Sequence, residues 1–93
     1  SCLKIYVIDD AMFLSLAAQG LAEETVAVLL TGMGTDGAEG LASMYKQGAY
    51  TIAQDETSCA VFGMPKAAIA RGAATQVLPL EHIADVVTGL FAR

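Results

Sequence analysis

The chain has 93 residues, 55% of them hydrophobic and 16% charged, a composition that predicts a globular fold around one modest core. Ten acidic against five basic residues give a net charge of −5, so a phosphate backbone would be repelled and we expect no nucleic-acid partner. No apolar run approaches the ~20 residues that cross a bilayer, and the start of the chain lacks the layout of a signal peptide, so we expect no membrane insertion.

The two cysteines, Cys2 and Cys59, bear on the compartment and on metal binding. They do not have the spacing of metal ligands, and a disulfide scaffold of this size would normally contain more of them. The sequence therefore predicts a protein of the reducing cytoplasm without a metal site.

Strand and helix patterns alternate along the chain. The segments with strand character are apolar and rich in β-branched residues, and they cover 3–8, 26–31, 50–54 and, with a weaker signal, 76–78. Helices are predicted after each of them: up to about Gly20, from Ala38 to a stop at Gly48, from Pro65 through Ile69 to a stop at Gly72, and over Ile83, Val86, Val87, Leu90 and Phe91.

This alternation is typical of right-handed βαβ units. It predicts the α/β class: three layers, with a mostly parallel sheet in the middle and helices on both of its faces. No repeat, low-complexity tract or linker divides the chain, so we expect residues 1–93 to form a single domain.

Functional groups of such sheets gather in the loops at the carboxyl ends of the strands. The loop GMGTDG at residues 32–37 is the most informative, because its three glycines permit sharp turns beside the carboxylate of Asp36. Two interpretations of Asp36 stay open: a catalytic carboxylate, or the first residue of a capping box that Glu39 would complete. Phosphate binding is disfavoured, because the loop does not end in Gly-Lys-Ser/Thr and Asp36 would repel the ligand.

Several blocks together resemble a known family. They are LTGMGTDGAEGL at 30–41, TIAQDETSCAVFGMPKAAIARGAA at 51–74, VLPL at 77–80 and, less closely, IDDAMFLSLA at 8–17. In order and spacing they are similar to the closing segments of the catalytic domain of bacterial chemotaxis protein-glutamate methylesterases, the CheB family. The resemblance covers most of the chain and implies that residues 1–93 are the C-terminal portion of that domain.

The resemblance also implies an activity. The family hydrolyses methyl esters of glutamates on chemoreceptors and deamidates certain glutamines with a Ser-His-Asp triad, without a cofactor. Its triad aspartate lies in the glycine-rich loop and corresponds to Asp36, where it would orient the histidine and stabilise the imidazolium. Gly32, Met33 and Gly34 would line the substrate site together with segment 58–64, although a plain packing role suits Met33 as well.

The resemblance further implies partners. These are the methylated cytoplasmic helices of chemoreceptors, a regulatory receiver domain and the upstream half of the catalytic domain. The family's serine and histidine both belong to that upstream half and have no counterpart here. We therefore expect the chain to be inactive alone, and its uncovered surfaces to favour self-association.

The remaining candidate nucleophiles and bases have simpler interpretations. Ser15, Ser43 and Ser58 do not lie in the strand-to-helix turn of a nucleophilic serine. His82 sits beside the apolar face of the last helix and is predicted to be a surface or boundary residue. Cys59 is predicted to be a structural thiol, because a reactive thiolate needs a positive charge nearby.

Two alternatives come from other functional classes. KIYVIDDAMF at residues 4–13 resembles the first strand and acidic pair of receiver domains, in which Asp9 and Asp10 would help to hold Mg²⁺ beside a phosphoacceptor. The chain is short for that fold, and its last strand lacks a Lys-Pro pair. A non-catalytic interaction domain that keeps the fold without the triad is the other alternative.

Overall fold

The computed structural model describes residues 4–6, 14–15, 17–31 and 37–91. Within these ranges, four parallel strands form one sheet in the order β1-β2-β3-β4. The strands are β1 (Lys4–Tyr6), β2 (Thr25–Leu29), β3 (Tyr50–Gln54) and β4 (Gln76–Leu78). All four lie where the sequence pattern predicted a strand, which confirms the parallel α/β class.

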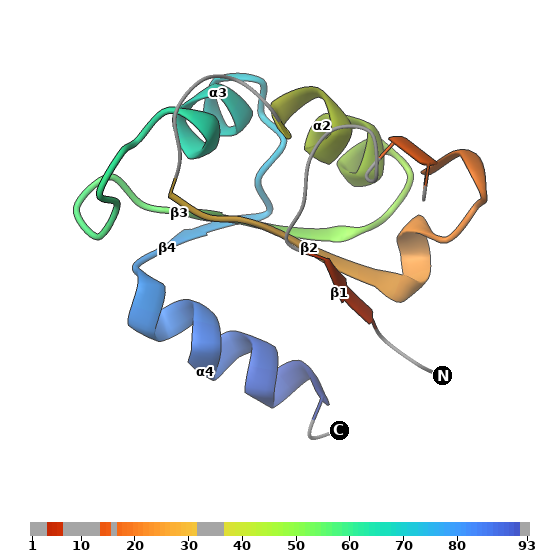
Figure 1. Ribbon diagram of the computed structural model, residues 1–93. Coiled ribbons are helices and arrows are strands. Elements are labelled where there is room, and N and C mark those ends of the chain that lie inside the picture. The colour runs from red at the N-terminus through yellow and green to blue at the C-terminus, as the bar shows by residue number, and fades with distance from the viewer. Residues whose placement is uncertain (1–3, 7–13, 16, 32–36, 92–93) are drawn as a thin grey trace.

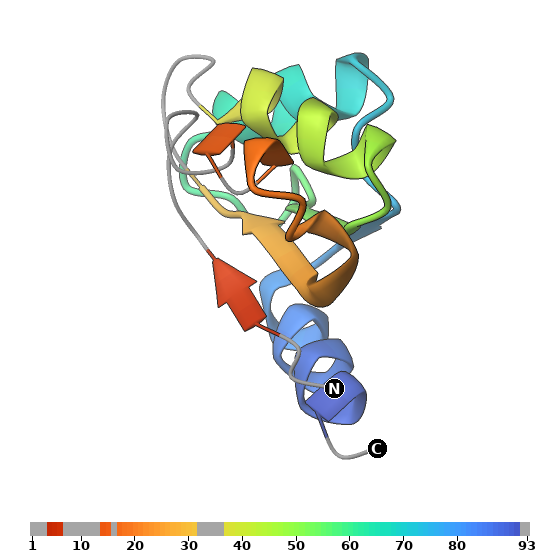
Figure 2. The same ribbon diagram turned by 90° about the vertical axis from the view of Figure 1, so that its right-hand side faces the viewer.

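The helices lie on both faces of this sheet. They are α2 (Ala38–Lys46), α3 (Met64–Ala70) and α4 (Leu80–Phe91), and a short 3-10 helix, η1 (Ala22–Glu24), leads into β2. Figure 1 shows α2 and α3 together on one face and α4 on the other. The side view in Figure 2 shows the same three layers, with β1 at one edge of the sheet. The predicted three-layer arrangement is therefore confirmed.

Glycines end two of the helices, as the sequence predicted. Gly48 follows α2 with φ +100°, and Gly72 follows α3 with φ +68°, conformations that other residues rarely adopt. At Gly48 an added Cβ would also lie 3.0 Å from Cγ of Glu23. The start of α3 is corrected by one residue, because Met64 precedes Pro65 in the helix.

The strand alternation divides the core into two parts. Ala27 and Leu29 pack with Leu41 and Met44 of α2 on one face, in a cluster that also contains many alanines. Val26 and Val28 point to the other face. There they meet Ile52, Ile83, Val86 and Val87, which joins the sheet to the predicted apolar stripe of α4.

The N-cap of α2 lies one residue after the position that the capping-box prediction gave it. The N-cap position of α2 is occupied by Gly37, in a left-handed conformation with φ +90°, and Asp36 itself lies outside the described residues. Glycine is an acceptable N-cap, and its backbone carbonyl accepts the first helical hydrogen bond, from the Leu41 amide at 2.8 Å. Gly37 itself has no side chain that could cap α2, and whether the carboxylate of Asp36 contacts the first turn lies outside the described residues.

None of the helices in the described ranges is long and apolar enough to cross a membrane.

Leu41 should be a main determinant of stability, since its side chain is fully buried between α2 and the sheet. We expect Leu41→Ala to lower the free energy of unfolding by about 2–5 kcal/mol, because the truncation leaves a cavity. Urea denaturation followed by circular dichroism measures this. The matched control is Leu80→Ala, whose leucine is 49% exposed and should lose less than about 1 kcal/mol. Equal losses would contradict the assigned core.

Candidate functional site

The candidate site lies where the carboxyl ends of β2, β3 and β4 meet. Because the three strands are parallel, the segments that follow Leu29, Gln54 and Leu78 emerge at the same edge of the sheet. The described part of this edge consists of Thr31, Gly37, the loop 55–63 and the start of α4. The glycine-rich loop of the sequence analysis connects two of these pieces.

Gln54 is the polar centre of the edge. Its side chain, 1% exposed, accepts a hydrogen bond from the Thr31 backbone amide at 2.9 Å. Its amide nitrogen donates to the Ser58 carbonyl oxygen at 2.8 Å and lies 3.2 Å from the Ser58 hydroxyl. The Gln54 amide thus joins the segment after β2 to the loop after β3.

Ser58 extends the same network to α4. Its hydroxyl donates to Oδ1 of Asp55 at 2.7 Å and accepts a hydrogen bond from the Leu80 amide at 3.0 Å. The Ser58 amide also donates to Asp55, at 3.0 Å. A hydroxyl with these partners organises a turn, which agrees with the prediction that Ser58 is not a nucleophile.

Thr31 and Val61 form a second bridge between the two loops. The Val61 amide donates to Oγ1 of Thr31 at 2.8 Å, and this hydroxyl donates to the Val61 carbonyl oxygen at 3.1 Å. One threonine side chain therefore satisfies both backbone groups of Val61, much as a neighbouring strand would.

The predicted site residues Gly32, Met33, Gly34 and Asp36 lie outside the described residues. The two positions that border them are described, and both belong to the carboxyl edge. Thr31 is bonded to Gln54, while Gly37 is buried at the start of α2. The segment 54–58 lies at the end of a strand and was a candidate functional loop on that ground, but no role was predicted for the side chains of Gln54 and Thr31. A glutamine at the end of an otherwise apolar strand was the available signal, because a buried amide must find partners.

Cys59 lies beside this network, and the charge that acts on it among the described residues is the negative one of Asp55. The thiol is partly buried, and its Sγ is 4.0 Å from the Gln54 carbonyl oxygen. Burial raises the pKa of the Cys59 thiol, a hydrogen bond with Thr31 partly offsets this, and the negative charge of Asp55 adds to the increase. The protonated thiol is favoured, which supports the structural role predicted for Cys59.

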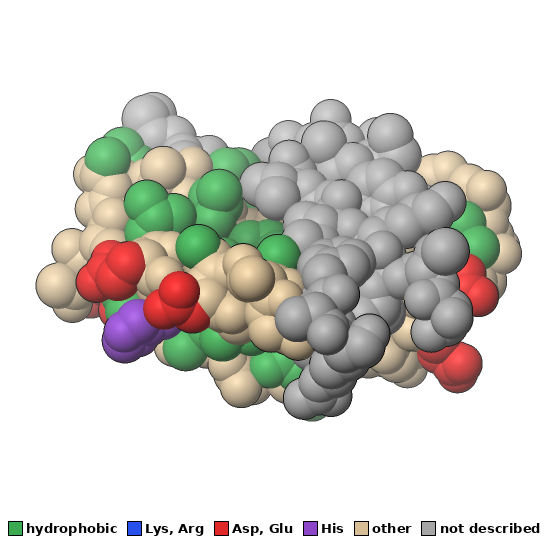
Figure 3. All heavy atoms as spheres, turned by 90° about the horizontal axis from the view of Figure 1, so that it is seen from below, with side chains coloured by type: hydrophobic (Ala, Val, Ile, Leu, Met, Phe, Trp, Pro, Cys, Tyr) green, Lys and Arg blue, Asp and Glu red, His purple; other side chains and the backbone are tan. Residues whose placement is uncertain are grey.

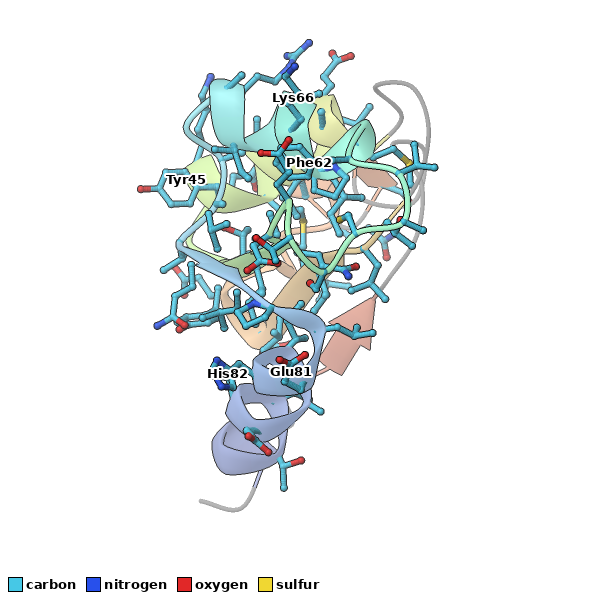
Figure 4. All side chains as sticks on the ribbon, turned by 90° about the vertical axis from the view of Figure 1, so that its left-hand side faces the viewer. Tyr45, Phe62, Lys66, Glu81 and His82 are labelled. Carbon is cyan, nitrogen blue, oxygen red and sulfur yellow. The ribbon has the colours of Figure 1, made fainter. Side chains whose placement is uncertain are left out.

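His82, the single histidine of the sequence, and Ser15 are both exposed. His82 is exposed, and Figure 4 shows it with Glu81 on α4, in the layer opposite the one that holds Tyr45 and Lys66. The surface prediction for His82 is therefore confirmed. Ser15 is exposed and its hydroxyl accepts a hydrogen bond from Gln19 at 3.0 Å, within one helical turn. Within the described ranges, no group of three or more His, Cys, Asp or Glu side chains could hold a metal ion.

Known proteins match this chain over most of its length. The protein-glutamate methylesterase/protein-glutamine glutaminase 4 of Burkholderia thailandensis is 63% identical over 70 residues, 75% of this chain and 20% of that protein. Protein-glutamate methylesterase/protein-glutamine glutaminase 2 of Burkholderia lata is 59% identical over 82 residues, 88% of this chain and 24% of that protein. The chain thus spans about a fifth to a quarter of the length of these curated relatives.

A solved structure shares the fold. The crystal structure of the Thermotoga maritima CheB methylesterase catalytic domain matches with a TM-score of 0.74 and 42% identity, over 78% of this chain and 39% of that domain's chain. The family model described as CheB methylesterase matches residues 6–87. The receiver alternative, which rested on residues 4–13, is not supported by these matches. The chain belongs to the CheB methylesterase family.

Proposed function

We propose that residues 1–93 are the C-terminal portion of a protein-glutamate methylesterase catalytic domain. The complete enzyme would hydrolyse glutamate methyl esters on chemoreceptors, and deamidate glutamines, in the cytoplasm. The observation that carries this proposal is the family match over residues 6–87, which includes the whole carboxyl edge described above. The names of the relatives, protein-glutamate methylesterase/protein-glutamine glutaminase, support both reactions.

Asp36 is the group that this chain would contribute to the chemistry. It belongs to the glycine-rich loop that starts after Thr31, and it directly precedes the buried N-cap Gly37. Because Gly37 is the N-cap, α2 does not require the carboxylate of Asp36 as its cap. That carboxylate would accept a hydrogen bond from the histidine of the upstream half, select its tautomer and stabilise its protonated form.

The reaction then follows the general serine-hydrolase sequence. The upstream serine would attack the ester carbonyl carbon while the histidine takes its proton, and methanol would leave with that proton as the acyl-enzyme forms. Water would then attack the acyl-enzyme, and glutamate would be released. Gly32, Met33 and Gly34 would line the substrate site, and no metal or organic cofactor is needed for these steps.

The surfaces of the chain support the upstream half of the domain as a partner. Within the described ranges β1 pairs only with β2, so its outer edge is open. Beside α4 lies a groove of about 410 Å³ lined by Val28, Leu30, Leu80, Glu81, Ile83, Ala84 and Val87. Figure 3 looks onto this face and shows hydrophobic side chains among the acidic ones. We propose that the upstream half covers both features, and that the complete enzyme also contacts a regulatory receiver domain and receptor helices.

Activity should require both halves. We expect the chain alone to release no methanol from methylated receptor, because an aspartate without its histidine and serine cannot form an acyl-enzyme. Adding the upstream part of the Burkholderia thailandensis relative as a separate chain should produce activity. Methanol release by the 93 residues alone, abolished by Cys59→Ala or His82→Ala, would contradict the assignment. A joined, folded and inactive enzyme would instead favour a non-catalytic interaction domain.

Asp36→Ala should separate the catalytic role from a stabilising one. In the completed enzyme we expect turnover to fall by roughly 10⁴-fold, as for other triads that lose the carboxylate's function. The free energy of unfolding should change by only about 0.3–1 kcal/mol, through the charge near the start of α2. Glu39→Ala is the matched control, since Glu39 is an exposed acid in the first turn of α2. Near-normal turnover of Asp36→Ala would contradict the catalytic role of Asp36. Its charge would then contribute only to the stability of α2.

The isolated chain should self-associate through its uncovered surfaces. We expect a dimer or a larger assembly in light scattering, because an open strand edge and an apolar groove favour pairing. Leu80→Glu should weaken the assembly, since Leu80 is 49% exposed in the groove. Tyr45→Glu is the control, since Tyr45 is 45% exposed on α2, on the opposite face of the sheet. A compact monomer at high concentration would contradict this prediction.

A further inference from the structure

We propose that Gln54 is a positioning residue of the esterase site, which acts by holding Thr31 at the carboxyl edge of the sheet. The inference rests on the proposed function, because it concerns the loop that carries Asp36. Gln54 contacts neither substrate nor reacting atoms in this proposal. Its role is to fix the segment from which the glycine-rich loop starts.

The side-chain amide of Gln54 suits this role because both of its ends are used. Its oxygen accepts from the Thr31 amide, and its nitrogen donates to the Ser58 carbonyl oxygen. The side chain is 1% exposed, so water cannot easily replace either partner. No buried side-chain nitrogen or oxygen in the described part of the chain lacks a partner, which shows that the network is satisfied.

The network fixes Thr31 from two directions. The backbone of Thr31 is held by Gln54, while its side chain is held by both backbone groups of Val61. Ser58 in turn holds the Leu80 amide at the start of α4. Side-chain hydrogen bonds therefore join the end of β2, the loop after β3 and the start of α4, in addition to the backbone hydrogen bond from the Asp55 amide to the Leu78 carbonyl oxygen.

Anchoring Thr31 would affect catalysis because Thr31 lies close to Asp36 in the sequence. It is followed directly by residues 32–36, and Gly37 at the far side is fixed by the start of α2. Only five residues separate the two anchors, so a displacement of Thr31 is passed to Asp36 over a short length of backbone. Small displacements of catalytic groups have large effects on turnover.

Matched variants can separate positioning from stability. Gln54→Met keeps the size of the side chain and removes its donor and acceptor, and Thr31→Val removes the hydroxyl that bridges to Val61. Thr31→Ser retains that hydroxyl and serves as the conservative rescue. The control is Thr51→Val, because Thr51 is also buried and its hydroxyl bonds to the Ala73 carbonyl oxygen and the Thr75 amide, at the opposite end of β3.

Amide hydrogen exchange of the 93-residue chain tests the anchor directly. Relative to the Ile52 amide in the middle of β3, we expect the Thr31 amide to exchange about tenfold faster in Gln54→Met, since its acceptor is gone. The same ratio should stay near the wild-type value in Thr51→Val. An unchanged Thr31-to-Ile52 ratio in Gln54→Met would overturn the anchoring role.

Turnover tests the consequence for catalysis. The completed enzyme joins this chain to the upstream part of the Burkholderia thailandensis relative, and kcat is divided by the folded fraction measured in the same sample. We expect kcat of Gln54→Met and Thr31→Val to fall by on the order of 10–100-fold, with KM within about twofold, because positioning acts on the transition state. Thr31→Ser and Thr51→Val should retain wild-type kcat to within about twofold.

The outcomes distinguish this inference from the proposed function. If Gln54→Met matches Thr51→Val in kcat per folded molecule, Gln54 is a structural core residue and the positioning inference is wrong. If the wild-type joined enzyme releases no methanol, the proposed function is wrong and the catalytic role of Gln54 fails with it. The exchange ratio would in that case still confirm or refute the anchoring of Thr31.

Discussion

When consecutive parallel strands are neighbours in a sheet, as in the order β1-β2-β3-β4, the segments that connect them can follow few paths. Crossovers between parallel strands are nearly always right-handed, so with the order β1-β2-β3-β4 the successive connections are expected on the same face of the sheet. Figure 1 shows this for α2 and α3. The opposite face of the sheet can be covered only by the segment that follows β4 or by parts of the protein outside the β1-to-β4 segment. Helix α4 covers part of it, and the groove beside α4 marks the part it leaves open.

The same constraint places the chemistry. Parallel strands bring all their carboxyl ends to one edge, but they do not determine how the loops there are held, because strand pairing stops at that edge. In this chain polar side chains hold the loops beyond the ends of the strands. The Gln54 side chain is hydrogen-bonded to the segments after β2 and β3, and Ser58 joins the loop after β3 to α4. Each such bond contributes only about 1 kcal/mol net, yet breaking one leaves a buried group without a partner. The edge is therefore held by specific hydrogen bonds more than by apolar packing.

The sequence predicted the periodic parts of the fold and was less reliable at the ends of elements. The spacing of apolar residues along the sequence located β2, β3, α2 and α4, because strands and helices that pack on a core each require a characteristic apolar pattern. The capping box placed the N-cap one residue too early, at Asp36 instead of Gly37, because the spacing of Asp36 and Glu39 does not specify the backbone conformation. No role was predicted for the Gln54 side chain for a related reason, because one of its partners, Thr31, is 23 residues away in the sequence.

The assignment of Asp36 came from resemblance rather than from periodicity, and it stays a prediction because Asp36 lies outside the described residues. Burial raises the pKa of the Cys59 thiol, the hydrogen bond with Thr31 partly offsets this, and the negative charge of Asp55 adds to the increase, so the environment disfavours a thiolate nucleophile. The described part of the edge is thus unsuited to an anionic nucleophile of its own. In the proposed function the nucleophile is instead a serine that is neutral until a histidine takes its proton, and both groups would come from the upstream half of the domain.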